Sequence, residues 1–133
     1  MTKFDQAYFA GFFDGEGYVG LYSNSKTTEA IRVIVGQGKN DVLYDMKNIW
    51  GGSVYARFDK RNNRPHYAWE IRARKAEKFL QDIKPFIRIK KEQVELALEA
   101  INLGYSEKLI IKDKIKAINS PMGFGRLKEV YHY

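Results

Sequence analysis

The sequence of 133 residues contains no cysteine and only two histidines. These absences exclude a disulfide framework, a thiolate metal site and a histidine-rich metal cluster, so any bound metal would need oxygen ligands. No apolar run approaches the roughly 18 residues of a membrane span, and no charged-then-apolar leader opens the chain. We therefore expect a soluble, intracellular protein without a membrane partner.

The sequence also has fewer acidic than basic residues, with 16 Asp and Glu and 23 Lys and Arg. Its formal net charge is +7. This excess favours a polyanionic partner such as nucleic acid. A basic protein without such a partner is the alternative, and charge alone does not separate the two. No linker or low-complexity stretch divides the chain, so we predict a single domain over residues 1–133.

Hydrophobic periodicity and turn residues predict an α+β order of helix, hairpin, helix, hairpin and then further helices. Asp5 is the expected N-cap of the first helix, and Gly51 and Gly52 are expected to end the second. Pro85 and Gly104 separate the later helices. Apolar residues on nearly every side of the first helix predict that it is buried from several directions. The expected helices are 5–14, 40–50, 74–84, 90–103 and 106–119, the expected strands are 18–24, 29–36, 53–59 and 66–73, and 120–133 is an expected extended tail.

Alternation along the strands sorts the predicted sheet into two faces. One face is expected to pack on the helices through Val19, Leu21, Ile31, Val33, Val35, Val54, Ala56, Phe58, Tyr67, Trp69 and Ile71. The other face mixes bases, amides and aromatics, as a surface that reads DNA base edges would. Its members are Tyr22, Asn24, Arg32, Ile34, Tyr55, Arg57 and Asp59, with His66, Ala68, Glu70 and Arg72 of the fourth strand. An ordinary solvated sheet face is the alternative.

Two acids, Asp14 and Glu16, lie among glycines at the end of the first helix, where the partial negative charge of a helix C-terminus disfavours them. Ala7, Gly11 and Gly15 form a stripe of small residues down one side of that helix. If a second copy packs on the stripe, a two-fold axis brings the two Glu16 carboxylates together, and cations between them would relieve their repulsion. The carboxylates are then shared metal ligands. The alternative is close packing of the helix on its own sheet.

The segment FAGFFDGEG, residues 9–17, resembles the signature of the LAGLIDADG homing endonucleases and matches it at Ala10, Gly11, Asp14 and Gly17. It closes a predicted helix and precedes a predicted hairpin, which is the order that family uses. The resemblance covers about residues 3–103. It implies an αββαββα fold with a saddle-shaped, four-stranded antiparallel sheet that lies along the DNA major groove, here with extra C-terminal helices. One motif per chain implies a homodimer joined through the stripe of small residues.

What the resemblance implies for the site is a divalent cation, Mg²⁺ or a similar ion, bound by Glu16 and by the Gly15 carbonyl. Asp14 is expected to brace the junction. Gln37 is expected to hold water near the metal, and Lys90 to offset charge on the phosphate. Without the resemblance, a loop amide and a solvated lysine are the better interpretations of Gln37 and Lys90.

The reaction implied is hydrolysis of double-stranded DNA at a long pseudo-palindromic site. Oxygen-ligated Mg²⁺ polarises a phosphodiester, activates water and stabilises the leaving 3′ oxygen, so neither a covalent nucleophile nor a small-molecule cofactor is expected. The resemblance implies that the homodimer cuts both strands across the minor groove and leaves short 3′ overhangs.

Three alternatives stay open. The first is a LAGLIDADG-like module that binds nucleic acid without cutting it, such as an intron RNA maturase or a DNA-binding regulator. The second is another nuclease fold built on an Asp followed by Glu-x-Lys, for which the nearest run is Asp59 with Glu70-Ile71-Arg72. The third is an interaction domain without nucleic acid, which would show low DNA retention at moderate salt.

Overall fold

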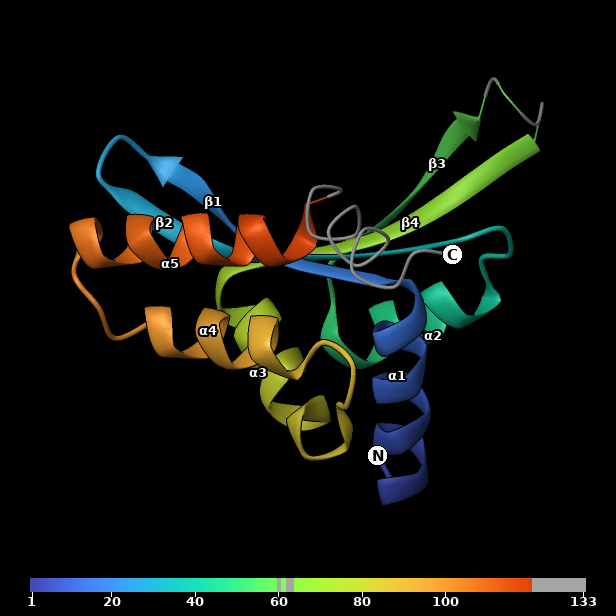
Figure 1. The fold of residues 1–133 in the computed structure, drawn as a ribbon. Coiled ribbons are helices and arrows are strands. Elements are labelled where there is room, and N and C mark those ends of the chain that lie inside the picture. The colour runs from blue at the N-terminus through green and yellow to red at the C-terminus, as the bar shows by residue number, and fades with distance from the viewer. Residues whose placement is uncertain (60, 62–63, 121–133) are drawn as a thin grey trace, which may run out of the picture.

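The computed structural model describes residues 1–59, 61 and 64–120, and it places a four-stranded sheet against a layer of helices (Figure 1). The predicted order of helix, hairpin, helix, hairpin and further helices is confirmed. The predicted tail lies outside the described residues from residue 121 onward. The elements are α1 (Lys3–Glu16), β1 (Gly17–Ser25), β2 (Thr28–Gln37), α2 (Asp41–Trp50), β3 (Ser53–Asp59), β4 (Arg64–Arg72), α3 (Ala73–Ile83), the 3-10 turn η1 (Lys84–Phe86), α4 (Lys91–Ala100) and α5 (Tyr105–Asn119).

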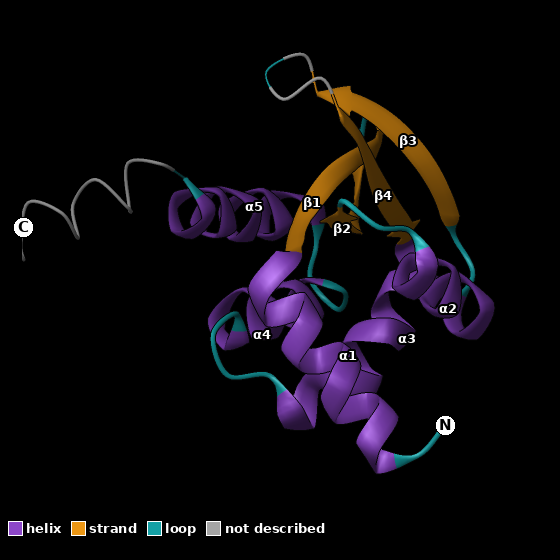
Figure 2. Ribbon diagram, turned by 90° about the vertical axis from the view of Figure 1, so that its right-hand side faces the viewer, coloured by secondary structure: helices purple, strands orange, loops and turns teal. Residues whose placement is uncertain are grey.

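The strand order is β1-β2-β4-β3, and every neighbouring pair is antiparallel. The two hairpins therefore join through β2 and β4, which lie in the middle of the sheet. Figure 2 shows the strands arching above the helices, which leaves the opposite face of the sheet uncovered by helices. None of the helices in the described residues has both the length and the apolar content of a membrane span.

The first helix begins two residues earlier than predicted, because Thr2 and not Asp5 is its N-cap. The Thr2 hydroxyl accepts a hydrogen bond from the Asp5 backbone N–H (3.1 Å), and the Asp5 carboxylate accepts one from the Thr2 backbone N–H (3.0 Å). The backbone N–H and the hydroxyl of Thr2 both donate to the Asp5 carboxylate, and these two hydrogen bonds lower the pKa of Asp5. The pair forms a capping box, in which both residues satisfy N–H groups at the helix start.

The end of α2 follows the prediction. Gly51 and Gly52 have φ values of +85° and +88°, in the region that glycine enters without steric cost. A Cβ atom at Gly52 would lie 2.5 Å from the Glu70 carbonyl oxygen, so no larger residue fits beside β4. The two glycines therefore let the chain turn sharply from α2 into β3.

The core lies between the helices and the sheet face that alternation predicted. Among the predicted core residues, Val19, Leu21, Ile31, Val33, Val35, Trp69 and Ile71 are buried, while Val54 and Tyr67 are partly buried. The prediction is wrong for Ala56 and Phe58, which are exposed, Phe58 by 63%. The physical reason is the length of the β3–β4 hairpin, which extends past the helices (Figure 1). Alternation assigns a side chain to a face but does not say whether a helix covers it.

The first helix is buried on one side only, so the prediction of burial from several directions is wrong for the single chain. Its buried residues are Phe9, Ala10, Phe13 and Asp14. Phe4 and Tyr8 are 88% and 60% exposed on another face of the helix. This exposed side includes the predicted stripe of small residues, Ala7, Gly11 and Gly15.

The last helix, α5, is attached to the β1–β2 hairpin by polar contacts. Lys112 Nζ lies 3.1 Å from Oε1 of Glu29, whose side chain is 1% exposed, and the Ser23 hydroxyl donates to the same carboxylate. Asn119 donates to the Val19 carbonyl. A buried charge of this kind is tolerated only when it is paired and hydrogen-bonded, so these contacts fix α5 against β1 and β2.

Candidate functional site

The C-terminal end of α1 is joined to the segment before α4 by Asp14. The Asp14 carboxylate accepts hydrogen bonds from the backbone N–H groups of Arg88 (2.8 Å) and Lys90 (3.0 Å), one on each oxygen. Asp14 is only 7% exposed. Both carboxylate oxygens are thereby engaged within the chain, which leaves Glu16 as the accessible acid of the pair.

The side chain of Lys90 returns to the same helix end. Its ammonium group donates to the Asp14 carbonyl oxygen at 2.8 Å. The last carbonyls of a helix have no partner within the helix, and a cation there is favoured by the helix dipole. Two predicted site residues that are 76 positions apart in the sequence are thus in direct contact.

Gln37 lies at the same end of the molecule, at the last position of β2. Gly17, which follows Glu16, pairs with Val35, and Gln37 is two residues beyond that partner. The side-chain oxygen of Gln37 accepts a hydrogen bond from the Gly38 backbone N–H at 2.7 Å. Its amide nitrogen, which can donate hydrogen bonds, is not used in this contact.

The oxygen atoms at this helix end are of the kind that Mg²⁺ prefers. The Glu16 carboxylate and the Gly15 carbonyl lie at the negative end of the α1 dipole, which attracts a cation. Within the part of the chain that the structure describes, no three His, Asp or Glu side chains are grouped to hold a metal. The residues fit a cation only if further oxygen ligands come from a second chain or from a phosphate.

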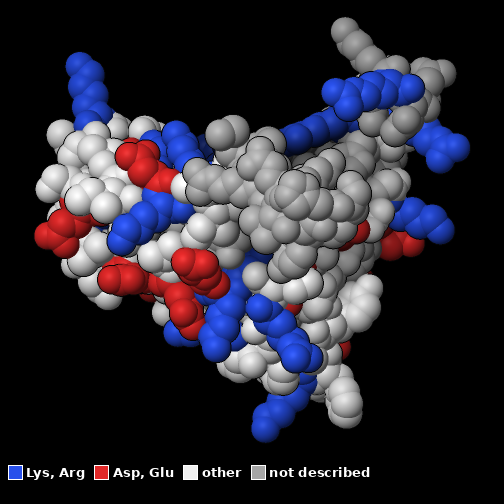
Figure 3. Space-filling view, viewed as in Figure 1, with Lys and Arg blue, Asp and Glu red and all other residues white. Residues whose placement is uncertain are grey.

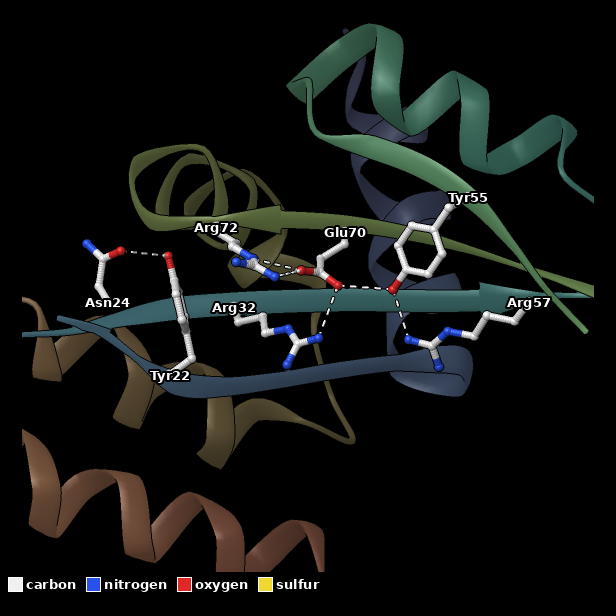
Figure 4. A network of polar contacts seen from close by, with 7 residues as sticks. All are labelled: Tyr22, Asn24, Arg32, Tyr55, Arg57, Glu70 and Arg72. Atoms are coloured by element: carbon white, nitrogen blue, oxygen red, sulfur yellow. Dashed lines mark hydrogen bonds and ion pairs between the residues drawn. The ribbon is translucent and has the colours of Figure 1, made fainter.

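The sheet face away from the helices carries a connected set of polar and aromatic side chains, which we call the Glu70 network (Figure 4). The Glu70 carboxylate is its centre and accepts hydrogen bonds from Arg32 Nη2 (3.2 Å), Tyr55 OH (3.0 Å) and Arg72 Nε (2.7 Å). The network consists of Tyr22, Asn24, Arg32, Tyr55, Arg57, Glu70 and Arg72.

Ring and hydroxyl contacts extend the Glu70 network to both sides. Arg57 donates to the Tyr55 hydroxyl at 2.8 Å, and its guanidinium carbon lies 5.3 Å from the centre of the Tyr55 ring. The guanidinium of Arg72 lies 5.0 Å from the centre of the Tyr22 ring. Contacts of this type hold an arginine in place without removing its charge.

Both charged partners at the centre stay ionised near neutral pH. Burial alone would raise the pKa of Glu70, but hydrogen bonds from Arg32, Arg72 and Tyr55 outweigh burial and hold that pKa below its ordinary value. Glu70 in turn raises the pKa of Arg72 through a hydrogen bond and its negative charge. The network therefore combines one carboxylate with three guanidinium groups.

The predicted base-reading residues are brought together on this face, with two qualifications. Ile34 is half-buried opposite Glu70 in the β2–β4 ladder, and the side chain of Asp59 lies outside the described residues. Alternation placed Glu70 on this face but assigned it no role. A signal was present, because Glu70 and Arg72 are two residues apart on one strand and so point the same way.

The alternative nuclease site built from Asp59 and Glu70 is wrong. In the β3–β4 ladder Glu70 lies opposite Ser53, whereas Asp59 lies opposite Arg64 at the other end. Six residues of extended strand separate the two positions by about 20 Å. Two carboxylates at that distance do not share a metal ion.

No protein-family model matches the chain, and no curated protein matches it. Solved structures do match. The homing endonuclease I-CvuI, in complex with its target in the presence of Ca, gives a TM-score of 0.75 at 20% identity and covers 88% of this chain and 83% of its own. The archaeal intron-encoded homing endonuclease I-Vdi141I, complexed with DNA, gives 0.71 at 17% identity over 88% and 85%. The LAGLIDADG homing endonuclease I-GzeII, in complex with a DNA target, gives 0.59 at 18% identity over 96% of this chain and 49% of its own.

Proposed function

We propose that this chain, whose fold is that of the LAGLIDADG homing endonucleases, is a site-specific endonuclease that cuts double-stranded DNA as a metal-dependent homodimer. The end of α1 carries the proposal. There Asp14 accepts hydrogen bonds from backbone N–H groups, while Glu16 is exposed at the end of the helix. Among the described residues, Asp14 has hydrogen-bond partners and Glu16 has none. A cation bound by Glu16 would explain why a second acid stands at a helix end that disfavours it.

The open sheet face is the proposed DNA-binding surface. The major groove of DNA admits a pair of β-strands, and arginine is the commonest side chain that reads guanine there. Figure 3 shows basic side chains at the tips of the two hairpins, while the acidic side chains over α4 and α5 are mixed with basic ones on the helix layer. The solved structures show I-CvuI in complex with its target and I-Vdi141I complexed with DNA, which supports the proposal. The proposed base-reading residues are Tyr22, Asn24, Arg32, Ile34, Tyr55, Arg57, Asp59 and Arg72.

The exposed side of α1 is the proposed homodimer interface. A Cβ atom added to Gly11 or Gly15 would have no neighbour within 4 Å, so packing among the described residues does not require glycine at either position. Phe4 and Tyr8 add exposed apolar surface to the same helix. A second copy packed here would bury that surface and let the two helix backbones approach closely. It would also bring the second Glu16 to the first.

In the proposed mechanism, Glu16 and the Gly15 carbonyl of each chain hold the divalent cation. When bound, the cation polarises the scissile phosphodiester and supplies an activated water. Gln37 orients water through its amide nitrogen. Lys90 provides positive charge for the phosphate as charge develops on it, and its anchoring to the Asp14 carbonyl places its ammonium group in advance. A two-fold dimer then cuts both strands of a pseudo-palindromic site.

The test is a cleavage selection on a randomised duplex library with Mg²⁺. The parent protein is compared with Glu16→Gln, and with Glu99→Gln as a control that removes the same charge from an exposed position of α4. We expect the parent and the control to release the same pseudo-palindromic sites, and Glu16→Gln to bind but not cut them. Cutting by Glu16→Gln would refute the metal-ligand role. DNA that is retained by all three proteins and cut by none would favour the non-cleaving nucleic-acid-binding alternative.

A further inference from the structure

A negative charge lies at the centre of a surface proposed to bind a polyanion. The Glu70 side chain is only 10% exposed and accepts hydrogen bonds from three side chains of the sheet face. Because it repels phosphate, such a carboxylate weakens the general attraction of the face for DNA. Its position therefore needs an explanation beyond affinity.

Folding of the sheet does not by itself explain the arrangement. Arg32 and Arg72 are directly opposite one another in the β2–β4 ladder. Like charges at directly opposite positions destabilise a sheet, and Glu70 offsets this by lying between them. A pair of apolar or hydroxyl side chains would stabilise these positions without a compensating acid. The two arginines are thus better explained by an external ligand with hydrogen-bond acceptors.

The guanidinium groups keep donors for such a ligand. Arg72 uses Nε and Nη2 towards Glu70, and Arg32 uses Nη2. The Nη1 groups of both take no part in these contacts and remain as donors. Arg32 Nε is different, because it is buried without a hydrogen-bond partner in the described part of the chain and does not face a ligand. The side chains of Arg32 and Arg72 are 36% and 52% exposed. Each of the two guanidinium groups is thus bonded to Glu70 and still partly accessible to a ligand.

Restricting an arginine in this way changes what it recognises. A flexible guanidinium follows phosphates of any sequence, whereas one held at a fixed place matches the paired acceptors O6 and N7 of guanine in the major groove. Ordering the side chain before binding also removes part of the entropy cost of recognition. The same hydrogen bonds reach Arg57 through the Tyr55 hydroxyl.

We infer that Glu70 is a specificity-determining positioning residue, which holds Arg32 and Arg72 for base reading and lowers the affinity of the sheet face for DNA of other sequence. This inference rests on the proposed DNA-binding function. The network has three guanidinium groups and one carboxylate, so it remains net positive and still attracts DNA.

The decisive variant is Glu70→Gln, which keeps the size of the side chain and removes its charge. Freed arginines make phosphate contacts, so we expect about tenfold tighter binding to random duplex and a salt slope steeper by about 1 to 2. Discrimination between the preferred site and sites with single base-pair changes should fall about fivefold or more at the positions that the arginines read. If Glu70 served only the stability of the sheet, Glu70→Gln would change neither the salt slope of DNA binding nor the discrimination at particular base pairs.

The experiment starts with a binding selection from a randomised duplex library, without cleavage, to find the preferred site of the parent protein. Equilibrium binding by fluorescence anisotropy then compares the parent, Glu70→Gln and Glu95→Gln across a salt series. Each protein is measured on the preferred site, on a panel of single-base-pair variants and on random duplex. Glu95→Gln is the matched control, because it removes the same charge from an exposed position of α4 on the helix side of the sheet.

If Glu70→Gln folds poorly, a second variant, Arg72→Gln, tests the same inference. The Arg72 side chain is half exposed, so its replacement should disturb the fold less. It should lose discrimination at base pairs that are also affected in Glu70→Gln. Loss at unrelated base pairs would overturn the inference. A Glu70→Gln variant that binds DNA as Glu95→Gln does would also overturn the inference. So would a Glu70→Gln variant that loses discrimination at one base pair without binding random duplex more tightly, because that result is expected if Glu70 reads a cytosine directly. A parent protein that enriches no sequence would instead refute the proposed function itself.

Discussion

At the scale of single residues, Asp14 and Glu16 show how neighbouring acids of one motif differ in their surroundings. Asp14 is buried and bonded to two backbone N–H groups, while Glu16 is exposed at the helix end. The contact from Asp14 also sets where the main chain of Lys90 lies, and the Lys90 side chain bonds back to the Asp14 carbonyl. The brace and the proposed catalytic lysine are therefore one structural unit.

We predict that Asp14→Asn lowers the free energy of unfolding by about 2–3 kcal/mol. The amide has one acceptor oxygen in place of two, so one backbone N–H in a partly buried site loses a bond to a charged group. Urea denaturation at a fixed protein concentration measures the change, with Asp113→Asn on the exposed surface of α5 as the control. If Asp14→Asn keeps the stability of the parent but no longer cuts DNA, Asp14 is a metal ligand and not a brace.

At the scale of elements, α1 has two sides with different purposes. One side packs Phe9, Ala10 and Phe13 into the core, and the other exposes Phe4, Tyr8 and the small residues. The hypothesis that the stripe of small residues packs on the chain's own sheet is wrong, because Gly11 and Gly15 have open space where a side chain would begin. A helix with a second apolar side that no other described part of the chain covers is typical of an interface.

We predict that Gly11→Leu converts a dimer into a stable monomer. The single chain has room for the new side chain, and leucine favours a helix by up to about 1 kcal/mol over glycine, so the fold is retained. A closely packed partner has no such room. Sedimentation velocity gives the oligomeric state, and Ser106→Leu, at an exposed position of α5, controls for an added apolar side chain. A dimeric Gly11→Leu variant would place the interface on another surface.

At the scale of the whole molecule, charge and shape are divided between two sides. The helices cover one face of the sheet (Figure 1). The open face carries the Glu70 network, whose members come from both hairpins (Figure 4). Under the proposed function, a net charge of +7 per chain would attract nucleic acid of any sequence, whereas the Glu70 network would select among sequences. The salt dependence of DNA binding would measure the general attraction, and the preference among sequences would measure the selection.

We predict that binding to duplex DNA weakens about a thousandfold or more between about 0.05 and 0.2 M salt, as for a protein that displaces many counterions. Lys26 is exposed in the turn between β1 and β2, at an end of the open face. Lys26→Gln should reduce the salt slope by about 1 on all sequences alike. Lys84→Gln, on η1 at the helix side, is the control and should leave the slope unchanged. A change in sequence preference for Lys26→Gln would show that Lys26 contacts a base.

Local features of the sequence were enough to predict the order of elements, the position of the segment 9–17 between the first helix and the first hairpin, and the faces of most strand residues. Each of these depends on neighbours in the sequence: alternation in a strand, glycine after α2, and small residues at helical spacing. The same local reasoning failed for Phe58 and for the start of α1. Coverage by distant helices decides the first, and a choice between two nearby capping residues decides the second.

The sequence by itself thus determined which elements form and which chemical groups are present, while the tertiary structure decided which groups meet. Pairing of β2 with β4 sets Arg32 against Arg72, with Glu70 between them. Packing of α1 beside the segment before α4 joins Asp14 to Lys90 across 76 positions. Contacts of this kind depend on the three-dimensional path of the chain, because residues far apart in sequence carry no local pattern that relates them.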